Sequence, residues 1–196
     1  MKAIISEFGR SIAATIFFAL IVCGVYPLVV FGLGRVMFTE QANGSLLIDN
    51  CGRVRGSKLL GQNFTGDKYF HPRPSAAGNN GYDPMASGGS NLGPTSGALF
   101  TNIRQNIAAY RSDNAIPANV PVPADAVTES GSGLDPDISL ANAEIQIARV
   151  ARARRLSPER VRELVRENTS GRDWGLFGEP RVNVMTLNFA LDGLEK

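Results

Sequence analysis

The strongest constraint on this chain is an uncharged apolar run near its N-terminus. From Ile12 to Leu33 the sequence holds no acidic or basic residue. About 20 apolar residues at about 1.5 Å each cross a hydrocarbon core of about 30 Å, so a helix of this length can span a bilayer. A cleaved signal peptide is the main rival, but its apolar region usually covers only about 7 to 15 residues. The sequence therefore favours a short N-terminal segment at 1–11 and a transmembrane helix at 12–36.

Basic residues beside the run indicate its orientation. Lys2 and Arg10 lie before it, together with the amino terminus, and only Arg35 follows closely behind. Because positive charge next to a span favours the cytoplasmic side, we expect the N-terminus in the cytoplasm. Residues 38–196 are then an extracytoplasmic domain, in a periplasm or an equivalent space.

Small side chains recur every four residues along the start of the span. They are Ser11, Thr15, Ala19 and Cys23. This spacing places them in one ladder on a helix, where a second helix can approach closely. A lone anchor also contains small residues by chance, and the sequence leaves both interpretations open. Pro27 follows the ladder and predicts a kink.

The remainder of the chain has the composition of one water-soluble domain. The 196 residues are 43% hydrophobic and 19% charged, which suits a single core. A formal net charge of +2 gives no basic field of the kind that attracts nucleic acid. Two cysteines and one histidine fall short of the cluster that zinc or iron needs, so we expect no metal site. Cys23 lies inside the apolar run and Cys51 after it, so we expect no disulfide.

Local patterns predict an α+β domain with Gly/Ser/Pro-rich loops. Short apolar runs at 46–48 and 59–60 indicate strands, and helical spacing indicates a helix at 96–110 that ends before Asp113. Ser139 is the expected cap of a helix that ends near Arg155, and Ser157 with Pro158 begins another. The segment 181–194 suits a helix best, with a strand as the alternative. Residues 61–94 contain aromatics among turn residues, which favours an ordered, packed loop over a linker.

The segment 130–133 resembles a phosphate-binding loop in its glycines, and the segment 87–90 resembles the ABC-transporter signature in composition only. No Lys-Ser or Lys-Thr follows 130–133, and its spacing matches neither the Walker pattern nor the dinucleotide fingerprint. Turns are favoured instead, with Asp135 and Asp137 capping the next helix. His71 has no orienting acid or oxyanion hole that spacing reveals, so we expect it at the surface or an interface. The default for the arginines at 149, 152, 154 and 155 is a solvated helix face, although such a helix can also bind anionic lipid.

Several motifs together resemble one family closely. In order after a single N-terminal span, they are QNF, YFHPRPSA, SGGSNLGPT, DAVTESGSGLDPDIS, ANAEIQIARVA and GEPRVNV. These residues resemble the KdpC family, the C subunits of the Kdp potassium-transporting P-type ATPases, from the anchor to Asp192. Asp137 and Leu140 depart from the usual pattern, which has His and Pro there. We therefore expect no special role for Asp137.

The resemblance implies an accessory subunit of an ATP-driven, high-affinity potassium uptake complex in the bacterial inner membrane. Its implied partners are membrane lipid, a channel-like potassium-binding subunit and a P-type subunit that hydrolyses ATP. Family members are described as catalytic chaperones that raise the ATP affinity of the hydrolysing subunit and support assembly. We expect no reaction by this chain itself, since it lacks both a phosphorylatable Asp-Lys-Thr-Gly motif and a Walker lysine. No cofactor of its own is expected, and ATP enters only through the complex.

The family motifs also give candidate residues for subunit contact or coupling. They are Gln62, Asn63, Phe64, Tyr69, Phe70, Arg73, Pro74, Ser75, Ser90, Asn91, Gly93, Pro94, Ser130, Gly131, Ser132, Gly133, Asp135 and Gln146. An extracytoplasmic domain cannot touch ATP on the cytoplasmic side, so any effect on ATP affinity is a coupling free energy carried across the membrane. The alternative is a purely structural, membrane-tethered scaffold that caps the ion-selecting subunit. A free-standing periplasmic enzyme is the third and remote hypothesis.

Overall fold

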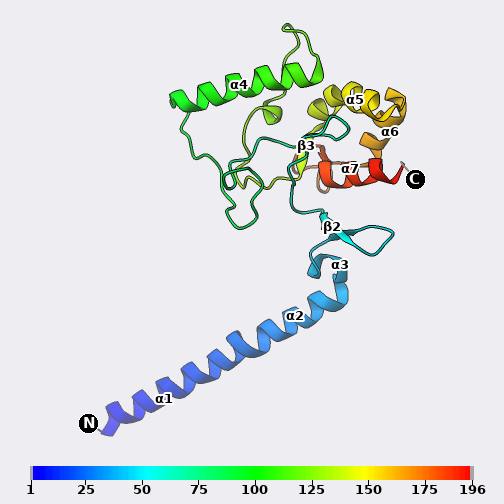
Figure 1. Cartoon of the computed structure of the whole chain (residues 1–196). Coiled ribbons are helices and arrows are strands. Elements are labelled where there is room, and N and C mark those ends of the chain that lie inside the picture. Colours follow the sequence, from blue (N-terminus) through cyan, green and yellow to red (C-terminus); the bar gives the residue numbers. More distant parts are fainter. Residues whose placement is uncertain (1, 195–196) are drawn as a thin grey trace. The chain divides into compact units, whose positions relative to one another are not determined.

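The computed structural model describes residues 2–194 and has the predicted α+β class, with an apolar N-terminal helix followed by a mixed domain (Figure 1). The chain divides into two compact units between Ser45 and Leu46. The first unit contains α1 (Lys2–Ala19), the π-helical turn η1 (Leu20–Val25), α2 (Tyr26–Met37) and α3 (Thr39–Ala42). The second contains β1 (Leu46–Ile48), β2 (Val54–Ser57), α4 (Gly97–Asn114), η2 (Ala124–Ala126), β3 (Asp137–Ser139), α5 (Leu140–Arg154), α6 (Pro158–Glu167), β4 (Thr169–Ser170), β5 (Arg181–Asn183) and α7 (Val184–Gly193).

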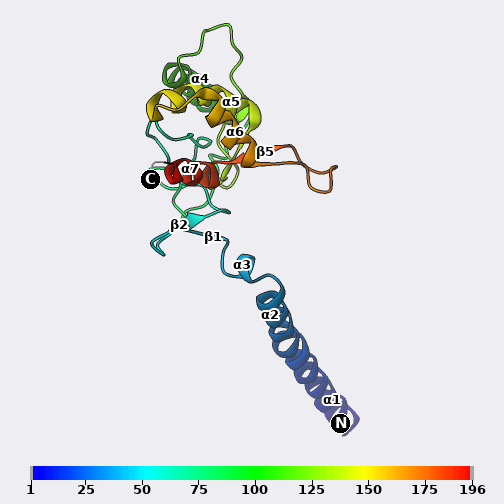
Figure 2. The ribbon, with the colours of Figure 1, turned by 90° about the vertical axis from the view of Figure 1, so that its right-hand side faces the viewer.

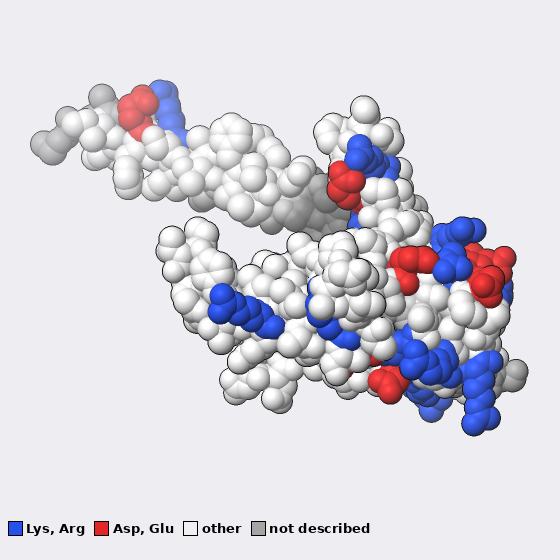
Figure 3. Space-filling model, turned by 90° about the horizontal axis from the view of Figure 1, so that it is seen from above, with Lys and Arg blue, Asp and Glu red and all other residues white. Residues whose placement is uncertain are grey.

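The first unit is dominated by one apolar helical stretch, Ile4–Met37, which is long and apolar enough to cross a membrane. Its surface is almost free of charge between its two ends (Figure 3). The irregularity that we expected at Pro27 lies in the turn just before it, η1, where the Tyr26 N–H bonds to the carbonyl of Ile21, five residues back. Within the small-residue ladder, the hydroxyls of Ser11 and Thr15 donate to the carbonyls of Glu7 and Ser11.

Cys23, the last residue of the ladder, lies inside η1, where the residue spacing differs from that of an α-helix. All four ladder residues are exposed within this chain. Docking of the ladder against another helix stays a prediction.

The main core of the second unit lies between a small antiparallel sheet and three helices. The sheet has the order β3-β5-β4, and Ile138 pairs with Val182 in its centre. Helices α5, α6 and α7 supply most of the remaining core. Its buried members are Phe70, Ile138, Ala143, Ile147, Val150, Ala151, Val161, Leu164, Val165, Val182, Val184, Leu187 and Leu191. Phe70 is fully buried, so the prediction that the 61–94 loop packs against the domain is confirmed.

Helix α4 contributes Tyr110 to a second, smaller cluster with Ala126 and Val127, and its Ile103 and Ile107 pack against that cluster. Ser96 caps its start by accepting from the Leu99 N–H. The helix continues to Asn114, beyond the predicted end, because the Asn114 amide donates to the Tyr110 carbonyl and its oxygen accepts from Arg149. One local bond and one bond from the distant Arg149, both at a buried position, extend a helix that composition alone predicts to end earlier.

The first hairpin differs from the prediction in its second strand. Strand β2 covers Val54–Ser57, whereas Leu59 and Leu60 follow it and are exposed. The cause is the turn between the strands, where the Asp49 carboxylate accepts from the backbone N–H groups of Cys51 and Arg53. These bonds hold the pKa of Asp49 down at about 2, with the Arg53 N–H as the largest cause. Because this tight turn closes early, β2 begins at Val54 and ends before Leu59 and Leu60.

The two serine caps were predicted correctly, whereas the capping role predicted for Asp135 and Asp137 is wrong: Asp137 lies in β3, and the Asp135 carboxylate accepts from the Asp137 N–H instead of a helix N–H. Ser139 caps α5 by accepting from the Asn142 N–H, and Ser157 caps α6 by accepting from the Arg160 N–H. The segment 181–194 is both a strand and a helix: β5 ends at Asn183, whose side chain caps α7. In each cap, a serine or asparagine oxygen accepts from an N–H that has no partner within the helix. This bond joins residues three positions apart, so the sequence alone can indicate it.

Candidate functional site

Two buried amide side chains hold Phe70 and His71, which belong to the motif YFHPRPSA, in place. Asn188 on α7 accepts from the Phe70 N–H at 2.9 Å and donates to the Phe70 carbonyl at 3.0 Å. Gln146 on α5 accepts from the His71 N–H at 2.7 Å and donates to the His71 carbonyl at 3.1 Å. Both amides are 1% exposed. Phe70 and His71 belong to no helix or strand. Each amide therefore bonds to both the N–H and the carbonyl of one of these residues and takes the place of secondary-structure bonds.

A buried guanidinium supports the same loop. Arg149 on α5 is 5% exposed and donates to the carbonyls of Asp67 and Tyr69, to the Asn114 oxygen and to the Gln146 oxygen. Burial lowers the pKa of Arg149, but an arginine stays charged in any case. The loop carbonyls thus surround a fixed positive charge. The predicted solvated arginine face is wrong here, because this side chain points inward.

Arg154, one further turn along α5, is also buried, with its side chain 1% exposed. It pairs with Asp192 at 2.7 Å and stacks on the Tyr69 ring at 5.0 Å from the ring centre. The prediction of a solvated face fails for this residue too, whereas Arg152 and Arg155 are exposed as expected. The arginine-rich helix therefore fastens the 66–70 loop to α5 and α7.

His71 sits beside this charge and is half-buried. Its ring Nε2 lies 3.2 Å from the Gly66 carbonyl. Burial lowers the pKa of His71, and the nearby Arg149 guanidinium lowers it further. The imidazole is therefore neutral at physiological pH. The expectation of a surface or interface residue is only partly right, because the backbone of His71 is clamped into the domain.

Three loops interlock next to this clamp, and we call this region the loop junction: residues 73–77, 87–89 and 129–135. The Ser75 hydroxyl donates to the Gly133 carbonyl at 2.6 Å. The Ser132 carbonyl accepts from both the Ser87 hydroxyl and the Gly88 N–H, each at 2.9 Å. Arg73 pairs with Asp135 at 3.0 Å across the junction. Motifs that are far apart in sequence are thus bonded directly to one another.

The junction requires a glycine at one position. Gly133 has φ +67°, a left-handed conformation that residues with a Cβ rarely adopt. A Cβ there would lie 2.6 Å from the Gly88 carbonyl oxygen and 2.7 Å from the Ala77 Cβ. By contrast, Gly131 has nothing within 4 Å of the corresponding position. The second glycine of the SGSG segment is therefore the point where the three loops meet.

Tyr82 belongs to this site although sequence reasoning did not select it. Its hydroxyl donates to the Arg73 carbonyl at 2.7 Å, and its N–H donates to the Ser75 hydroxyl at 2.8 Å. Burial raises the pKa of Tyr82. The available signal was an aromatic residue within a run of glycine and asparagine. Asn188 was missed for another reason, since a polar residue on an apolar helix resembles a solvent-facing position.

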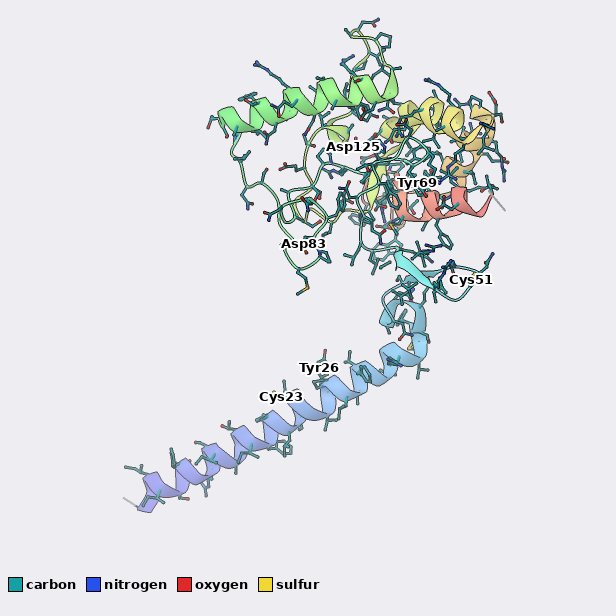
Figure 4. All side chains as sticks on the ribbon, viewed as in Figure 1. Cys23, Tyr26, Cys51, Tyr69, Asp83 and Asp125 are labelled. Atoms are coloured by element: carbon teal, nitrogen blue, oxygen red, sulfur yellow. The ribbon has the colours of Figure 1, made fainter. Side chains whose placement is uncertain are left out.

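The structure separates the predicted contact residues into five groups. The loop junction contains Arg73, Pro74, Ser75, Ser130, Gly131, Ser132, Gly133 and Asp135, and the clamp contains Phe70 and Gln146. Gln62, Phe64 and Tyr69 line a cavity of about 410 Å³ between the β1–β2 hairpin and α7, and Figure 4 marks Tyr69. Ser90 lies in a smaller cavity beside α4, whereas Asn63, Asn91, Gly93 and Pro94 are exposed. A direct part of any of them in subunit contact stays a prediction.

The chemistry available at the junction is limited by these internal bonds. The Gly88 N–H is already bonded to Ser132, and the Gly133 N–H bonds to the Ser130 carbonyl at 3.3 Å. Arg73 is engaged by Asp135 and by the Glu129 carbonyl. A phosphate cradle needs N–H groups that point outward, and these two point into the fold. Ser87 and Ser132 are exposed residues of the junction, and their hydroxyls take part in its internal bonds: the first donates to the Ser132 carbonyl and the second accepts from the Leu134 N–H.

Comparison with known proteins shows which family shares this sequence. Residues 8–193 match the family model described as KdpC, the K⁺-transporting ATPase c chain. The chain belongs to the KdpC family. A potassium-transporting ATPase KdpC subunit from Mycobacterium tuberculosis is 54% identical over 170 residues, covering 87% of this chain and 89% of its own length. KdpC subunits from Nitratidesulfovibrio vulgaris and Koribacter versatilis are 50% and 48% identical and cover 94% and 99% of this chain.

Proposed function

We propose that this chain is the accessory subunit of an ATP-driven, high-affinity potassium uptake complex in a bacterial inner membrane. The observation that carries the proposal is the match to the KdpC family over residues 8–193, which includes the apolar helix as well as the whole domain. Its partners are then a channel-like potassium-binding subunit and a P-type subunit that hydrolyses ATP. The chain itself performs no reaction, because neither of its glycine loops carries the lysine that phosphate transfer uses.

The charge bias around the span supports an N-terminus in the cytoplasm and a periplasmic domain. Cys51 tests this orientation, because it is a free, exposed cysteine in the turn of the β1–β2 hairpin. In sealed vesicles of known orientation carrying Cys23→Ser, a membrane-impermeant thiol reagent should label Cys51 only from the periplasmic face. Labelling only from the cytoplasmic face would reverse the orientation.

The subunit acts as a catalytic chaperone, raising the ATP affinity of the hydrolysing subunit by a coupling free energy of about 1–3 kcal/mol carried across the membrane. The internal bonds of the loop junction support this, because a coupling element needs a defined surface that distinguishes the states of its partner. Ser87→Ala and Ser132→Ala each remove one internal bond of the junction, the Ser87 hydroxyl to the Ser132 carbonyl and the Leu134 N–H to the Ser132 hydroxyl, while the Gly88 to Ser132 backbone bond remains. An intact complex with a raised half-saturating ATP concentration is the expected result, and an unchanged ATP requirement would count against coupling through the junction.

A second candidate function is a purely structural scaffold, which a separate observation favours. The 171–180 hairpin projects from the body of the second unit (Figure 2) and is held at its base by an Arg172–Glu179 ion pair. Its tip exposes three large apolar side chains, with Trp174 at 90%, Leu176 at 76% and Phe177 at 61%. Such a tip suits docking into a partner subunit.

The variant Trp174→Ser distinguishes the scaffold function from the coupling function. Trp174→Ser should reduce co-purification of the other subunits if the hairpin is the docking element, without changing the ATP requirement of the complex that still forms. If Trp174→Ser leaves assembly at the wild-type level, the hairpin is not the scaffold contact.

The small-residue ladder is the proposed seam between the span and the channel-like subunit. Ala19→Leu with Cys23→Leu should weaken assembly while the chain remains in the membrane. Val22→Leu, a smaller enlargement at the residue before Cys23, is the control for a change off the ladder. If the ladder variant and the control assemble equally well, the helix is a tether and not a contact with the channel-like subunit.

A further inference from the structure

The cavity of about 410 Å³ between the β1–β2 hairpin and α7 is a site of its own, because none of the described residues that line it belongs to the loop junction. Its volume lies in the range of small-molecule sites. At one side of it the hairpin is seated directly on α7, since a Cβ at Gly56 would lie 2.5 Å from the Met185 Cε atom. The cavity is therefore bounded by packed elements of one compact unit, residues 46–196.

One wall of the cavity is apolar and aromatic. It consists of Phe64, Tyr69, Met185 and Phe189. The rings of Phe64 and Tyr69 lie 5.3 Å apart and are tilted by 48°. The Tyr69 hydroxyl already donates to Asp192 at 3.2 Å, so this wall presents carbon surface. Such a wall favours a flat, apolar ligand body, which can stack on the rings.

The other wall carries two guanidinium groups that share one carboxylate oxygen. The Nε atoms of Arg53 and Arg55 donate to the Asp49 Oδ2 atom at 3.0 and 3.1 Å. The Asp49 Oδ1 atom accepts from the N–H groups of Cys51 and Arg53. Four bonds fill the acceptor capacity of a carboxylate. Within the described part of the chain, neither guanidinium has a further partner, which leaves the Nη amino groups of both as donors for a ligand.

A β-bulge brings the second arginine to this position. Arg55 is an extra residue of β2, because Gly56 and Val54 on either side of it pair with two consecutive residues of β1. An extra residue of this kind redirects a side chain, and bulges often lie beside functional sites for that reason. Here the redirected side chain joins Arg53 on Asp49. The fold therefore places two like charges at one counter-ion.

The charges around the cavity leave a surplus of one positive charge. Arg53 and Arg55 share the single charge of Asp49. The other acid in the lining, Asp192, is paired with Arg154 at 2.7 Å. One surplus charge suits a monoanion better than a polyphosphate, which would bring several negative charges. A guanidinium offers planar, paired donors, which match the two oxygens of a carboxylate.

We propose that the cavity between the β1–β2 hairpin and α7 binds a small amphipathic monoanion, a carboxylate with a flat, apolar body. The carboxylate lies on the Nη groups of Arg53 and Arg55. The body lies against the rings of Phe64, Tyr69 and Phe189. The ligand is a free small molecule, because one apolar wall and one pair of donors match a single head group on a compact body. This inference is independent of the proposed function, since every residue in it belongs to the second unit.

The native Cys51 gives a direct reporter, because it lines the cavity and is free (Figure 4). The full chain with Cys23→Ser, in mild detergent, is treated with N-ethylmaleimide, a neutral thiol reagent, and the modification rate of Cys51 is followed by mass spectrometry. The probes are 2-naphthoate and 2-naphthamide, which share a body and differ in charge, and acetate, which has the head group alone. We expect 2-naphthoate to slow the modification in a saturable way, at a concentration at least about tenfold lower than 2-naphthamide, and acetate to have no effect.

Two variants assign the charge dependence to the cavity. Arg53→Gln with Arg55→Gln should remove the advantage of 2-naphthoate over 2-naphthamide. Arg152→Gln with Arg155→Gln, a pair of exposed arginines on α5, is the matched control and should keep it. Each rate is compared with and without probe in the same variant, so a change in the intrinsic reactivity of the thiol cancels. A chain with Cys23→Ser, Cys51→Ser and Arg152→Cys tests for effects of the probe on the detergent, and its cysteine should not be protected.

Four results would overturn the proposal. The amide can protect Cys51 as well as the carboxylate does, the cysteine at position 152 can be protected equally, the advantage of the carboxylate can survive Arg53→Gln with Arg55→Gln, or Cys51 can be protected only when the other subunits are present. The last result would assign the cavity to a protein partner. The comparison of the two probes needs no substitution in the cavity, so it decides the matter even if the glutamine pair disturbs the hairpin.

Discussion

Replacing Asn188 with leucine should destabilise the domain strongly, although no contact with solvent or ligand changes. The substitution removes both hydrogen bonds to Phe70, leaving a buried N–H and a buried carbonyl without partners. Phe70 is 0% exposed, so water cannot replace them. Each orphaned group costs about 1–3 kcal/mol, which gives a loss of about 2–6 kcal/mol. That is a large share of the total stability of about 5–15 kcal/mol for a typical domain.

The measurement is urea unfolding of the full chain in mild detergent, followed by circular dichroism. The single tryptophan, Trp174, is 90% exposed and therefore a poor reporter of unfolding. Asn102→Leu, at an exposed position of α4, is the matched control and should change the free energy of unfolding by no more than about 0.5 kcal/mol. If Asn188→Leu unfolds within that same margin, the amide clamp does not hold the loop and the reasoning about the site is wrong.

Three further predictions follow from the same contacts. Gly133→Ala should destabilise by about 2 kcal/mol or more in thermal unfolding, because of its positive φ and the Gly88 contact, whereas Gly131→Ala should have little effect. Because burial and Arg149 depress the pKa of His71, the unfolded chain binds more protons than the folded one near pH 6, so stability should fall as pH drops below about 6.5. His71→Gln should lose that component of the pH dependence, and an unchanged slope would assign it to other groups. Ser139→Ala should cost about 1 kcal/mol through loss of the α5 cap, measured by urea unfolding.

What the sequence revealed depended on how local each interaction is. The long apolar helix, the caps at Ser139 and Ser157, and the amphipathic helices arise from residues within a few positions of one another, and all of them were predictable. The second strand was misplaced because the Asp49 turn, rather than the leucine pair, determines where the hairpin closes. Propensity in a short apolar run says little about strand register.

The site was predictable only as a list of motifs. Their meeting at the loop junction depends on bonds such as Ser75 to Gly133 and Ser87 to Ser132, which join distant segments and leave no periodic pattern. Arg149 was misread because a charged residue on a helix is usually solvated, and only the surrounding loop carbonyls make its burial favourable. Asn188 and Tyr82 both bond to backbone groups, and the sequence does not mark such partners.

The most direct test of the central claim is potassium uptake from low external K⁺ by cells that lack this chain but express the channel-like and ATP-hydrolysing subunits. If the chain is the accessory subunit of that complex, uptake should be absent in these cells and restored by the full chain. Residues 46–196 without the helix should restore much less. Wild-type uptake in cells without the chain would contradict the proposed function.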